Sequence, residues 1–209
     1  IIPIWFRGDS NLLDKQKAWK MLIRGTFLKW VYSHIDKAFY VGSANKAYFK
    51  HFGLKDTQLV FAPHSIDNSR FAAPHQNESS LMRKQFNIGE SDILILFSAK
   101  LEPKKNPELL LDAFNELDRS DLHLLFVGNG ILQESLKAKV KKLNLSNVHF
   151  KDFQNQSKMP AVYQCCDVFC LPSAGPGETW GLAVNEAMAA GKAVIVSTKV
   201  GCAVDLVSP

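Results

Sequence analysis

The sequence predicts an α/β protein with a doubly wound parallel sheet, preceded by the tail of a second α/β domain. Two observations support this fold class. From about residue 90 onward, short apolar runs alternate strictly with stretches of helical periodicity. This alternation is typical of parallel strands joined by right-handed helical crossovers. Before residue 76 the same pattern is shorter and less regular, which predicts only part of another domain.

Residues 1–75 hold the shorter part of the pattern. We expect strands over 2–6, 38–41 and 58–61, a basic helix between the first two, and a short helix over 43–51. Ser43 is the expected N-cap of the short helix and Gly53 its stop. Residues 63–80 carry Pro, Asn and Ser, so they are expected to form an interdomain linker.

The second part is predicted to contain five strands separated by helices. The strands are expected over 93–97, 122–127, 148–150, 168–171 and 193–197. The helices are expected over 106–117, 131–143, 157–164 and 182–190, with one more beginning at Ala203. The predicted domains are therefore residues 1–75 with the crossover, a linker with a first helix over 76–90, and a second domain over 91–209.

The ends of the sequence and its composition bound the class of protein. The chain begins without Met in an apolar strand-like run and ends just after a helix-like segment, so we expect an internal piece of a longer protein. With 46% hydrophobic and 22% charged residues it has a globular composition. No apolar run reaches the length of a membrane span and no signal peptide is present, which favours a cytoplasmic location.

The four cysteines favour buried reduced thiols over a metal site. Cys165 and Cys166 are adjacent, Cys170 lies in the following strand and Cys202 is remote, so no Cys-x-x-Cys pair exists. Two of the scattered histidines, His123 and His149, fall in strand patterns and are expected to be packed. We therefore expect no bound metal.

The positive charge is concentrated in the first third of the chain. Residues 1–75 contain 11 of the 25 Lys and Arg but only 5 of the 20 Asp and Glu. Within residues 14–32 a helix is predicted whose basic stripe is Lys17, Lys20 and Arg24 and whose apolar residues are Trp19, Leu22, Ile23, Thr26, Phe27, Trp30 and Val31. Such a helix could rest on an anionic membrane surface, or its apolar face could pack on the sheet of its own domain. No nucleic-acid-binding motif accompanies the charge.

A ligand site is predicted where two loops meet. In the usual order of such a sheet, the first and fourth strands are neighbours and ligands bind at their carboxyl ends. The loop after the first strand carries Lys100 and Lys105, which suit phosphate oxygens. The loop after the fourth carries Glu178 and leads into a helix containing Glu186. That helix N-terminus favours an anion, and carboxylates accept hydrogen bonds from paired hydroxyls. The alternatives are exposed lysines and acidic residues that complement the helix dipole.

These segments together resemble the retaining family 4 glycosyltransferases of the GT-B fold, and the resemblance covers most of the chain. Residues 161–172, Glu178, Gly181, 186–189 and Gly191 are similar to the family's Glu-x7-Glu region. The loop 100–105 resembles its basic pair, with Ala99-Lys100 where Gly-Arg is commoner, and 127–130 resembles its Val-Gly-x-Gly turn. Residues 36–44 and 63–71 are similar to the end of its N-terminal domain and the crossover, with His64-Ser65 replacing Asn-Gly.

The resemblance implies a Rossmann-like donor domain over 91–209 and transfer of a sugar from a nucleoside diphosphate sugar, with retention, by a front-face mechanism, without metal or cofactor. Glu178 would hold sugar hydroxyls, Glu186 the ribose diol, and Lys100 and Lys105 the departing diphosphate. The further binding residues implied are Thr179, Trp180, Gly181 and Leu182 through their backbone, Gly128 in the turn, and Asp152 and Phe153 near the base.

The acceptor implied is a glycan or a lipid-linked molecule, as in polysaccharide biosynthesis, and the chain alone is expected to be inactive because most of the acceptor-side domain is missing. Two other functions stay open, namely a non-catalytic sugar-nucleotide-binding module and a nucleotide-sugar epimerase of the same fold.

Overall fold

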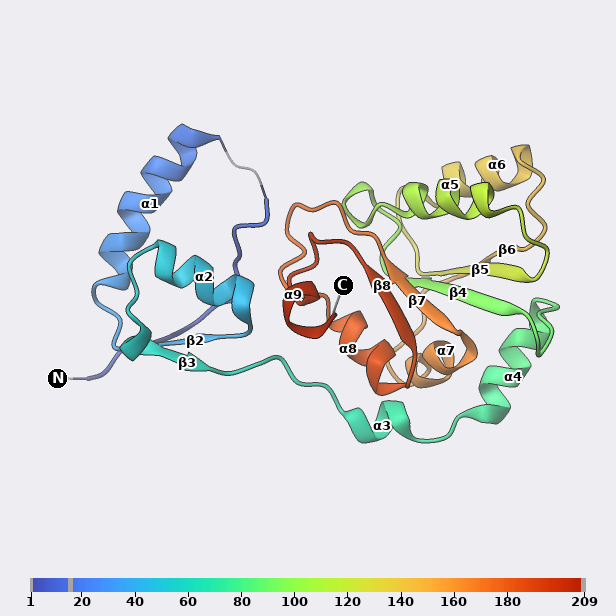
Figure 1. Cartoon of the computed structure of the whole chain (residues 1–209), viewed down its shortest axis with the longest axis horizontal. Coiled ribbons are helices and arrows are strands. Elements are labelled where there is room, and N and C mark those ends of the chain that lie inside the picture. The colour runs from blue at the N-terminus through green and yellow to red at the C-terminus, as the bar shows by residue number, and fades with distance from the viewer. Residues whose placement is uncertain (1, 15–16, 208–209) are drawn as a thin grey trace. The chain divides into compact units, whose positions relative to one another are not determined.

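The computed structural model of the chain describes residues 2–14 and 17–207 (Figure 1). The chain forms two compact units, and each consists of more than one segment. The first unit contains the residues up to Ser65 together with 175–181 and the residues from Thr198 onward, and the second contains 66–174 and 182–197. The division between the units lies at residues 65 and 66, whereas the sequence places its boundaries at 75 and 91. Lys15 and Gln16, within the predicted basic helix region, lie outside the described residues.

The first unit contains a three-stranded parallel sheet. Its strands are β1 (Trp5–Arg7), β2 (Lys37–Tyr40) and β3 (Leu59–Phe61), in the order β1-β2-β3. Its helices are α1 (Ala18–Tyr32), α2 (Ser43–His51) and the short α9 (Ala203–Leu206). Helices α1 and α2 pack on the sheet through one cluster whose largest buried members include Tyr32, Phe49 and Phe52. The parallel strands and helices expected in this region are therefore present.

Helix α2 begins differently from the sequence prediction. Gly42, not Ser43, is the residue before the first helical turn, and Ser43 does not cap its own helix. Instead the backbone N–H of Ser43 donates to Asp205 Oδ2 at 2.9 Å, and its hydroxyl donates to Oδ1 of the same carboxylate. The acid that complements this helix N-terminus therefore comes from α9, far away in the sequence.

The second unit is a doubly wound parallel sheet of five strands. They are β4 (Ile93–Ser98), β5 (Leu122–Val127), β6 (Val148–Lys151), β7 (Val168–Leu171) and β8 (Ala193–Val196). The order β6-β5-β4-β7-β8 makes β4 and β7 neighbours, and Leu96 pairs with Phe169 across them. The predicted adjacency of the first and fourth strands is confirmed. The carboxyl ends of all five strands therefore meet one edge of the sheet.

Helices cover both faces of this sheet. On one face lie α5 (Pro107–Leu117) and α6 (Gln133–Lys142); on the other lie α7 (Met159–Cys165) and α8 (Leu182–Ala189) (Figure 1). The central strands are apolar at nearly every position, as buried parallel strands are, and Phe97, Leu124 and Phe126 are fully buried. The sequence boundaries of β5 and β7 are confirmed residue by residue.

The stretch predicted to be a linker, residues 63–80, contains helices. They are α3 (Asn68–Ala72) and the beginning of α4 (Gln76–Gln85). Asp67 caps α3, because its side chain accepts the backbone N–H of Arg70 at 3.0 Å. Asn, Ser and Asp start helices as readily as they form turns, so the same composition supports both structures. The prediction of an irregular linker was wrong over α3, whereas α4 is the first helix that the sequence predicts within 76–90.

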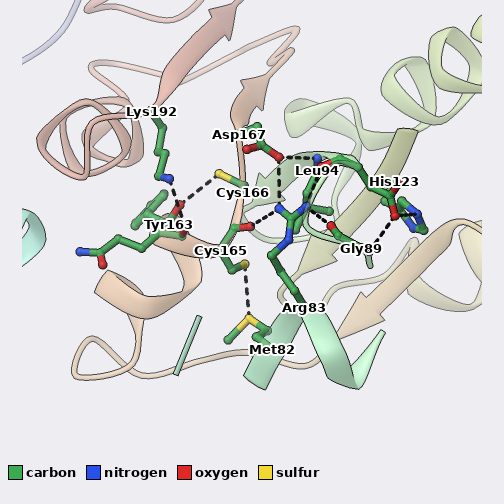
Figure 2. A network of polar contacts seen from close by, with 12 residues as sticks. Met82, Arg83, Gly89, Leu94, His123, Tyr163, Cys165, Cys166, Asp167 and Lys192 are labelled. Atoms are coloured by element: carbon green, nitrogen blue, oxygen red, sulfur yellow. Dashed lines mark hydrogen bonds and ion pairs between the residues drawn. The ribbon is translucent and has the colours of Figure 1, made fainter. Parts of the chain in front are cut away.

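Arg83 fastens α4 to the strands of the second unit (Figure 2). Its guanidinium donates to the carbonyls of Cys165, Gly89 and Asp92 at 2.6–2.9 Å. It also forms an ion pair with Asp167 Oδ2 at 3.1 Å. The same carboxylate oxygen accepts the Leu94 N–H at 2.7 Å. One arginine thus holds α4, the end of α7 and the beginning of β4 together.

The predicted packing of the cysteines and of two histidines is confirmed. All four cysteines are buried and free, and burial raises the pKa of Cys165 to about 12. His123 Nδ1 and His149 Nε2 lie 3.0 Å apart, with their rings stacked. Within residues 2–14 and 17–207, no cluster of three His, Cys, Asp or Glu could hold a metal ion. In the same residues, no helix combines the length and apolarity needed to cross a membrane.

Candidate functional site

A pocket of about 460 Å³ opens at the carboxyl edge of the second unit's sheet. Its wall combines a lysine, a carboxylate and a tyrosine with small and apolar groups, all from this one unit. The lining residues are Ser98, Ala99, Lys100, Val127, Gly128, Asn129, Phe153, Gln154, Gln156, Met159, Tyr163, Ala183 and Glu186. The pocket lies at the ends of β4 and β5, beside α8, at the edge where an open α/β sheet holds its ligands. The sequence predicted the site between the loops after β4 and β7, and no residue of the loop after β7 lines this pocket.

Two glycines let the turn after β5 pack directly on the loop after β4. Gly128 has φ +133°, and a Cβ there would lie 2.2 Å from the carbonyl oxygen of Ala99. A Cβ at Gly130 would lie 2.2 Å from the carbonyl oxygen of Leu101. Neither position has room for a side chain. The Val-Gly-x-Gly turn therefore builds this wall of the pocket from backbone.

The side chain of Asn129 links two segments of the pocket wall. Its side-chain oxygen accepts the backbone N–H of Phe153 at 2.6 Å, so the segment after β6 is tied to the turn after β5. The Phe153 ring is 73% exposed at the pocket wall, which leaves its face available to a flat ligand. Asp152 is not among the lining residues, and its carboxylate accepts from Gln133 Nε2 at 3.2 Å.

Glu186 lies in the pocket wall with both carboxylate oxygens engaged. Tyr163 donates its hydroxyl to Oε2 at 2.7 Å, and Gln156 Nε2 donates to Oε1 at 3.2 Å. The Gln156 amide oxygen accepts in turn from Arg70 Nη2 at 2.8 Å. A chain of hydrogen bonds from α3 to α8 thus fixes the Glu186 carboxylate before any ligand arrives.

The Tyr163 hydroxyl is a permanent donor. The residue is 1% exposed, and burial, followed by the negative charge of Glu186, raises its pKa well above the ordinary value. Phe71 packs edge-on against the Tyr163 ring, with the ring centroids 5.8 Å apart. Arg70 and Phe71 of the crossover segment therefore contact Gln156 and Tyr163, the two residues that hold Glu186.

The two lysines of the β4 loop have different positions. Lys100 is exposed and lines the pocket, whereas Lys105 ends a 3₁₀ turn over Pro103–Lys105, is partly buried and is not among the lining residues. The loop after β7 meets this turn, because Ala174 N–H donates to the Lys104 carbonyl at 2.9 Å. The beginning of the loop after β7 therefore lies against the loop after β4, whereas the meeting of Lys100 and Lys105 with Glu178 stays a prediction.

The segment Glu178 to Gly181, which precedes α8 in the chain, belongs to the first unit. There the Thr179 hydroxyl donates to Asp9 Oδ2 at 2.8 Å. The indole of Trp180 is buried, with its ring 5.8 Å from that of His64. The carbonyls of Glu178 and Trp180 accept the N–H groups of Gly201 and Cys202 at 3.2 and 2.9 Å. Leu182, the first residue of α8, is in the second unit and is exposed.

Sequence reasoning missed several residues of the pocket wall, above all Tyr163 and Gln156. One signal for Tyr163 exists, because a tyrosine inside an apolar helix needs a partner for its hydroxyl. Gln156 lies in an irregular segment with no periodicity, so nothing in the sequence indicates its contact with Glu186.

The sequence is similar to those of glycosyltransferases. The sequence model of the family described as Glycosyl transferases group 1 matches residues 78–209. A lipopolysaccharide 1,2-N-acetylglucosaminetransferase of Salmonella typhimurium is 32% identical over 158 residues, covering 70% of this chain and 41% of that protein. A phosphatidyl-myo-inositol mannosyltransferase of Mycobacterium tuberculosis is 34% identical over 150 residues, covering 68% of this chain and 35% of that protein.

A similar fold is present among solved structures. The crystal structure of Anabaena Alr3699/HepE in complex with UDP matches with a TM-score of 0.83 at 19% sequence identity. The match covers 99% of this chain and 56% of that one. The chain spans less than half of the length of the two curated relatives, 41% and 35%.

Proposed function

We propose that this chain is the donor-binding part of a retaining glycosyltransferase. The premise is that the chain belongs to the family described as Glycosyl transferases group 1 and has the GT-B type of α/β fold. The donor is a nucleoside diphosphate sugar. The observation that carries the proposal is the pocket of the second unit, in which Lys100 and the pre-positioned Glu186 carboxylate line one cavity at the carboxyl ends of β4 and β5. A lysine suits phosphate oxygens and a carboxylate accepts hydrogen bonds from a diol, so the two groups match the two polar parts of a nucleoside diphosphate.

Glu186 holds the ribose. Each of its oxygens already accepts one hydrogen bond, from Tyr163 or Gln156, and each has a second lone pair for a ligand hydroxyl. Because these donors hold the carboxylate in place, little conformational entropy of the Glu186 side chain is lost when a diol binds. The exposed ring of Phe153 and the Gly128 turn lie along the same wall and are suited to the base. Asp152 acts only through the backbone of its segment.

The basic loop after β4 and the α8 N-terminus receive the diphosphate. Lys100 contacts it first, and Lys105 adds positive charge from the neighbouring turn, so that charge growing on the leaving group is stabilised without a metal or cofactor. Glu178 holds sugar hydroxyls, and the backbone of Thr179, Trp180, Gly181 and Leu182 meets the sugar and phosphate. The leaving phosphate assists deprotonation of the acceptor in a front-face mechanism. These roles rest on the family motif.

The transferred group is a hexose or a hexose derivative, and the acceptor is a glycan or a lipid-linked molecule. The names of the Salmonella and Mycobacterium relatives, which specify lipopolysaccharide and phosphatidyl-myo-inositol, favour the lipid-linked class. The four buried free thiols suit the reducing cytoplasm. Because every pocket-lining residue belongs to the second unit, the chain alone should bind donor, whereas transfer needs a positioned acceptor and should be slow.

Titration calorimetry with UDP, GDP and ADP, and with a sugar derivative of each, tests the proposal. We expect one nucleotide class to bind, and Lys100→Ala to weaken its binding by about tenfold, the value of one charge-assisted phosphate contact. Lys104→Ala is the matched control, because this lysine lies in the same loop but does not line the pocket. Failure of all three classes to bind the folded chain, or equal losses in both variants, would contradict the assignment of the pocket.

A further inference from the structure

Arg70 is the outermost member of the hydrogen-bond chain that ends at Glu186, and it does not line the pocket. Its Nη2 atom donates to Gln156 Oε1 at 2.8 Å, and Gln156 Nε2 donates to Glu186 Oε1 at 3.2 Å. All three residues belong to the second unit. A single side chain therefore separates the arginine from the carboxylate.

Arg70 determines which way round the Gln156 amide lies. A guanidinium has donors only and an ionised carboxylate has acceptors only, whereas an amide has one oxygen and one NH2 group. Between the two charged groups, the amide satisfies both neighbours only when its oxygen faces Arg70 and its NH2 group faces Glu186. Without the arginine, the exposed Gln156 side chain would be held by one hydrogen bond of 3.2 Å and would be free to turn toward water.

The arginine is itself fixed on α3. Asp67 accepts the backbone N–H of Arg70 at 3.0 Å at the beginning of this helix. At its end, the Gln164 side chain donates to the carbonyls of Phe71 and Ala73 at 2.9 and 2.7 Å. The guanidinium carbon lies 4.8 Å from the centre of the buried Phe71 ring. Because Arg70 is already ordered, little further entropy is lost when it holds its partner.

We propose that Arg70 is a positioning residue that, through Gln156, makes the pocket select ribonucleotides over 2′-deoxyribonucleotides. The inference rests on the proposed function, in which Glu186 accepts hydrogen bonds from the ribose diol. A carboxylate held at both oxygens keeps one lone pair of each for the two neighbouring hydroxyls. A 2′-deoxyribose leaves one of these lone pairs without its donor.

A loosely held carboxylate would discriminate less between the two sugars. It could turn toward the remaining hydroxyl or toward water, so the missing hydroxyl would matter less. Binding of the ribose form would also have to order the Glu186 side chain, which weakens that form above all. Loss of the Arg70 contact should therefore lower the selectivity for ribose more than it lowers binding of the deoxy form.

Titration calorimetry of the whole chain with UDP, GDP and ADP and with their 2′-deoxy analogues tests the proposal. The measured quantity is the dissociation constant of the deoxy form divided by that of the ribose form. This ratio is insensitive to a loss of folded protein, because both ligands meet the same folded fraction. For the nucleotide that binds, we expect a ratio of at least about ten in the unaltered chain. In Arg70→Met it should fall by about threefold to tenfold.

Three further variants separate positioning from other effects. Arg70→Lys should keep the ratio within about twofold of the unaltered value, because an ammonium also has donors only. Gln156→Met should lower the ratio as Arg70→Met does, and the double variant should be no worse than either, since the arginine acts only through the amide. Arg119→Met is the matched control, because Arg119 is equally exposed but pairs with Asp121 outside the pocket.

The possible failures of this inference and of the proposed function are distinguishable. If the unaltered chain prefers ribose and Arg70→Met keeps that preference, only this inference is wrong. The same holds if the double variant loses more than Gln156→Met, which would mean that Arg70 acts on the ligand directly, or if Arg119→Met lowers the ratio as much. A chain that binds a nucleotide without preferring ribose would overturn the role of Glu186 and this inference with it. Absence of binding by all three ribonucleotides would overturn the proposed function as well.

Discussion

Removing the hydroxyl of Tyr163 is the most direct test of how Glu186 is held. In Tyr163→Phe the Glu186 Oε2 atom loses a donor at 2.7 Å, while Gln156 still donates to Oε1 at 3.2 Å. A hydrogen bond to a charged group contributes about 1.5–3 kcal/mol. The pocket allows water to replace part of it, so we expect the free energy of unfolding to fall by about 1–2 kcal/mol.

The effect on ligand binding should be smaller than the effect on stability. The carboxylate of the variant remains in the pocket but is less well held, and ordering it costs about 0.5–1.5 kcal/mol. Affinity for the nucleoside diphosphate should therefore fall by about threefold to tenfold. Tyr40→Phe, in the other unit, is the control and should leave that affinity unchanged.

A double-mutant cycle with Glu186→Gln separates positioning from packing. Urea unfolding and calorimetry on the two single variants and the double variant should give a coupling energy of about 1 kcal/mol or more, since the two groups are in direct contact. If the coupling is within about 0.3 kcal/mol of zero, or if stability falls while affinity stays constant, Tyr163 only packs and the reasoning about Glu186 fails.

Two further predictions concern the backbone and the acid stability of the second unit. Gly128→Ala should lower the free energy of unfolding by about 2–4 kcal/mol and abolish nucleotide binding, because φ is positive and the new Cβ meets the Ala99 carbonyl. Gly191→Ala is the control, since φ is +74° there but no atom lies near the new Cβ, and it should lower the free energy of unfolding by only about 1 kcal/mol. Urea titrations measure both values. Burial, with repulsion from His123, lowers the pKa of His149 from 6.5 to about 4. Between pH 6.5 and about pH 4 the unfolded chain therefore binds more protons than the folded chain, and the free energy of unfolding falls as the pH drops through this range. In His149→Gln the acid-induced decrease in the free energy of unfolding should be smaller by about 2 kcal/mol. If the pH dependence of stability is unchanged in this variant, His149 is not the source of the decrease.

The alternation of apolar runs and helical stretches was sufficient to predict the sheet of the second unit. β5 and β7 lie where the pattern places them because each run is bounded by turn residues and too short for a helix. The strand order followed from the general behaviour of such sheets, and it places the loop that carries Lys100 and Lys105 at the carboxyl edge of the sheet.

The remaining errors arise where the sequence pattern supports two structures. In α1 both faces are apolar, so the spacing of Trp19 and Leu22 cannot tell which side meets the sheet; the contacts of Met21 and Tyr32 decide it. Asp67 is a helix cap in a segment that also suits a linker. The pairing of Tyr163 with Glu186 depends on how α7 packs against α8, and no local pattern contains that information.

The backbone contact between Gly128 and Ala99 has a consequence for the divergence of specificity. Because main-chain atoms set the spacing of the two loops, the architecture of the pocket does not depend on which side chains project from it. The exposed ring of Phe153 can therefore be exchanged at little cost to folding, while either glycine cannot. The proposed nucleotide pocket can therefore change its preference through substitutions of lining side chains such as Phe153, while Gly128 and Gly130 are retained.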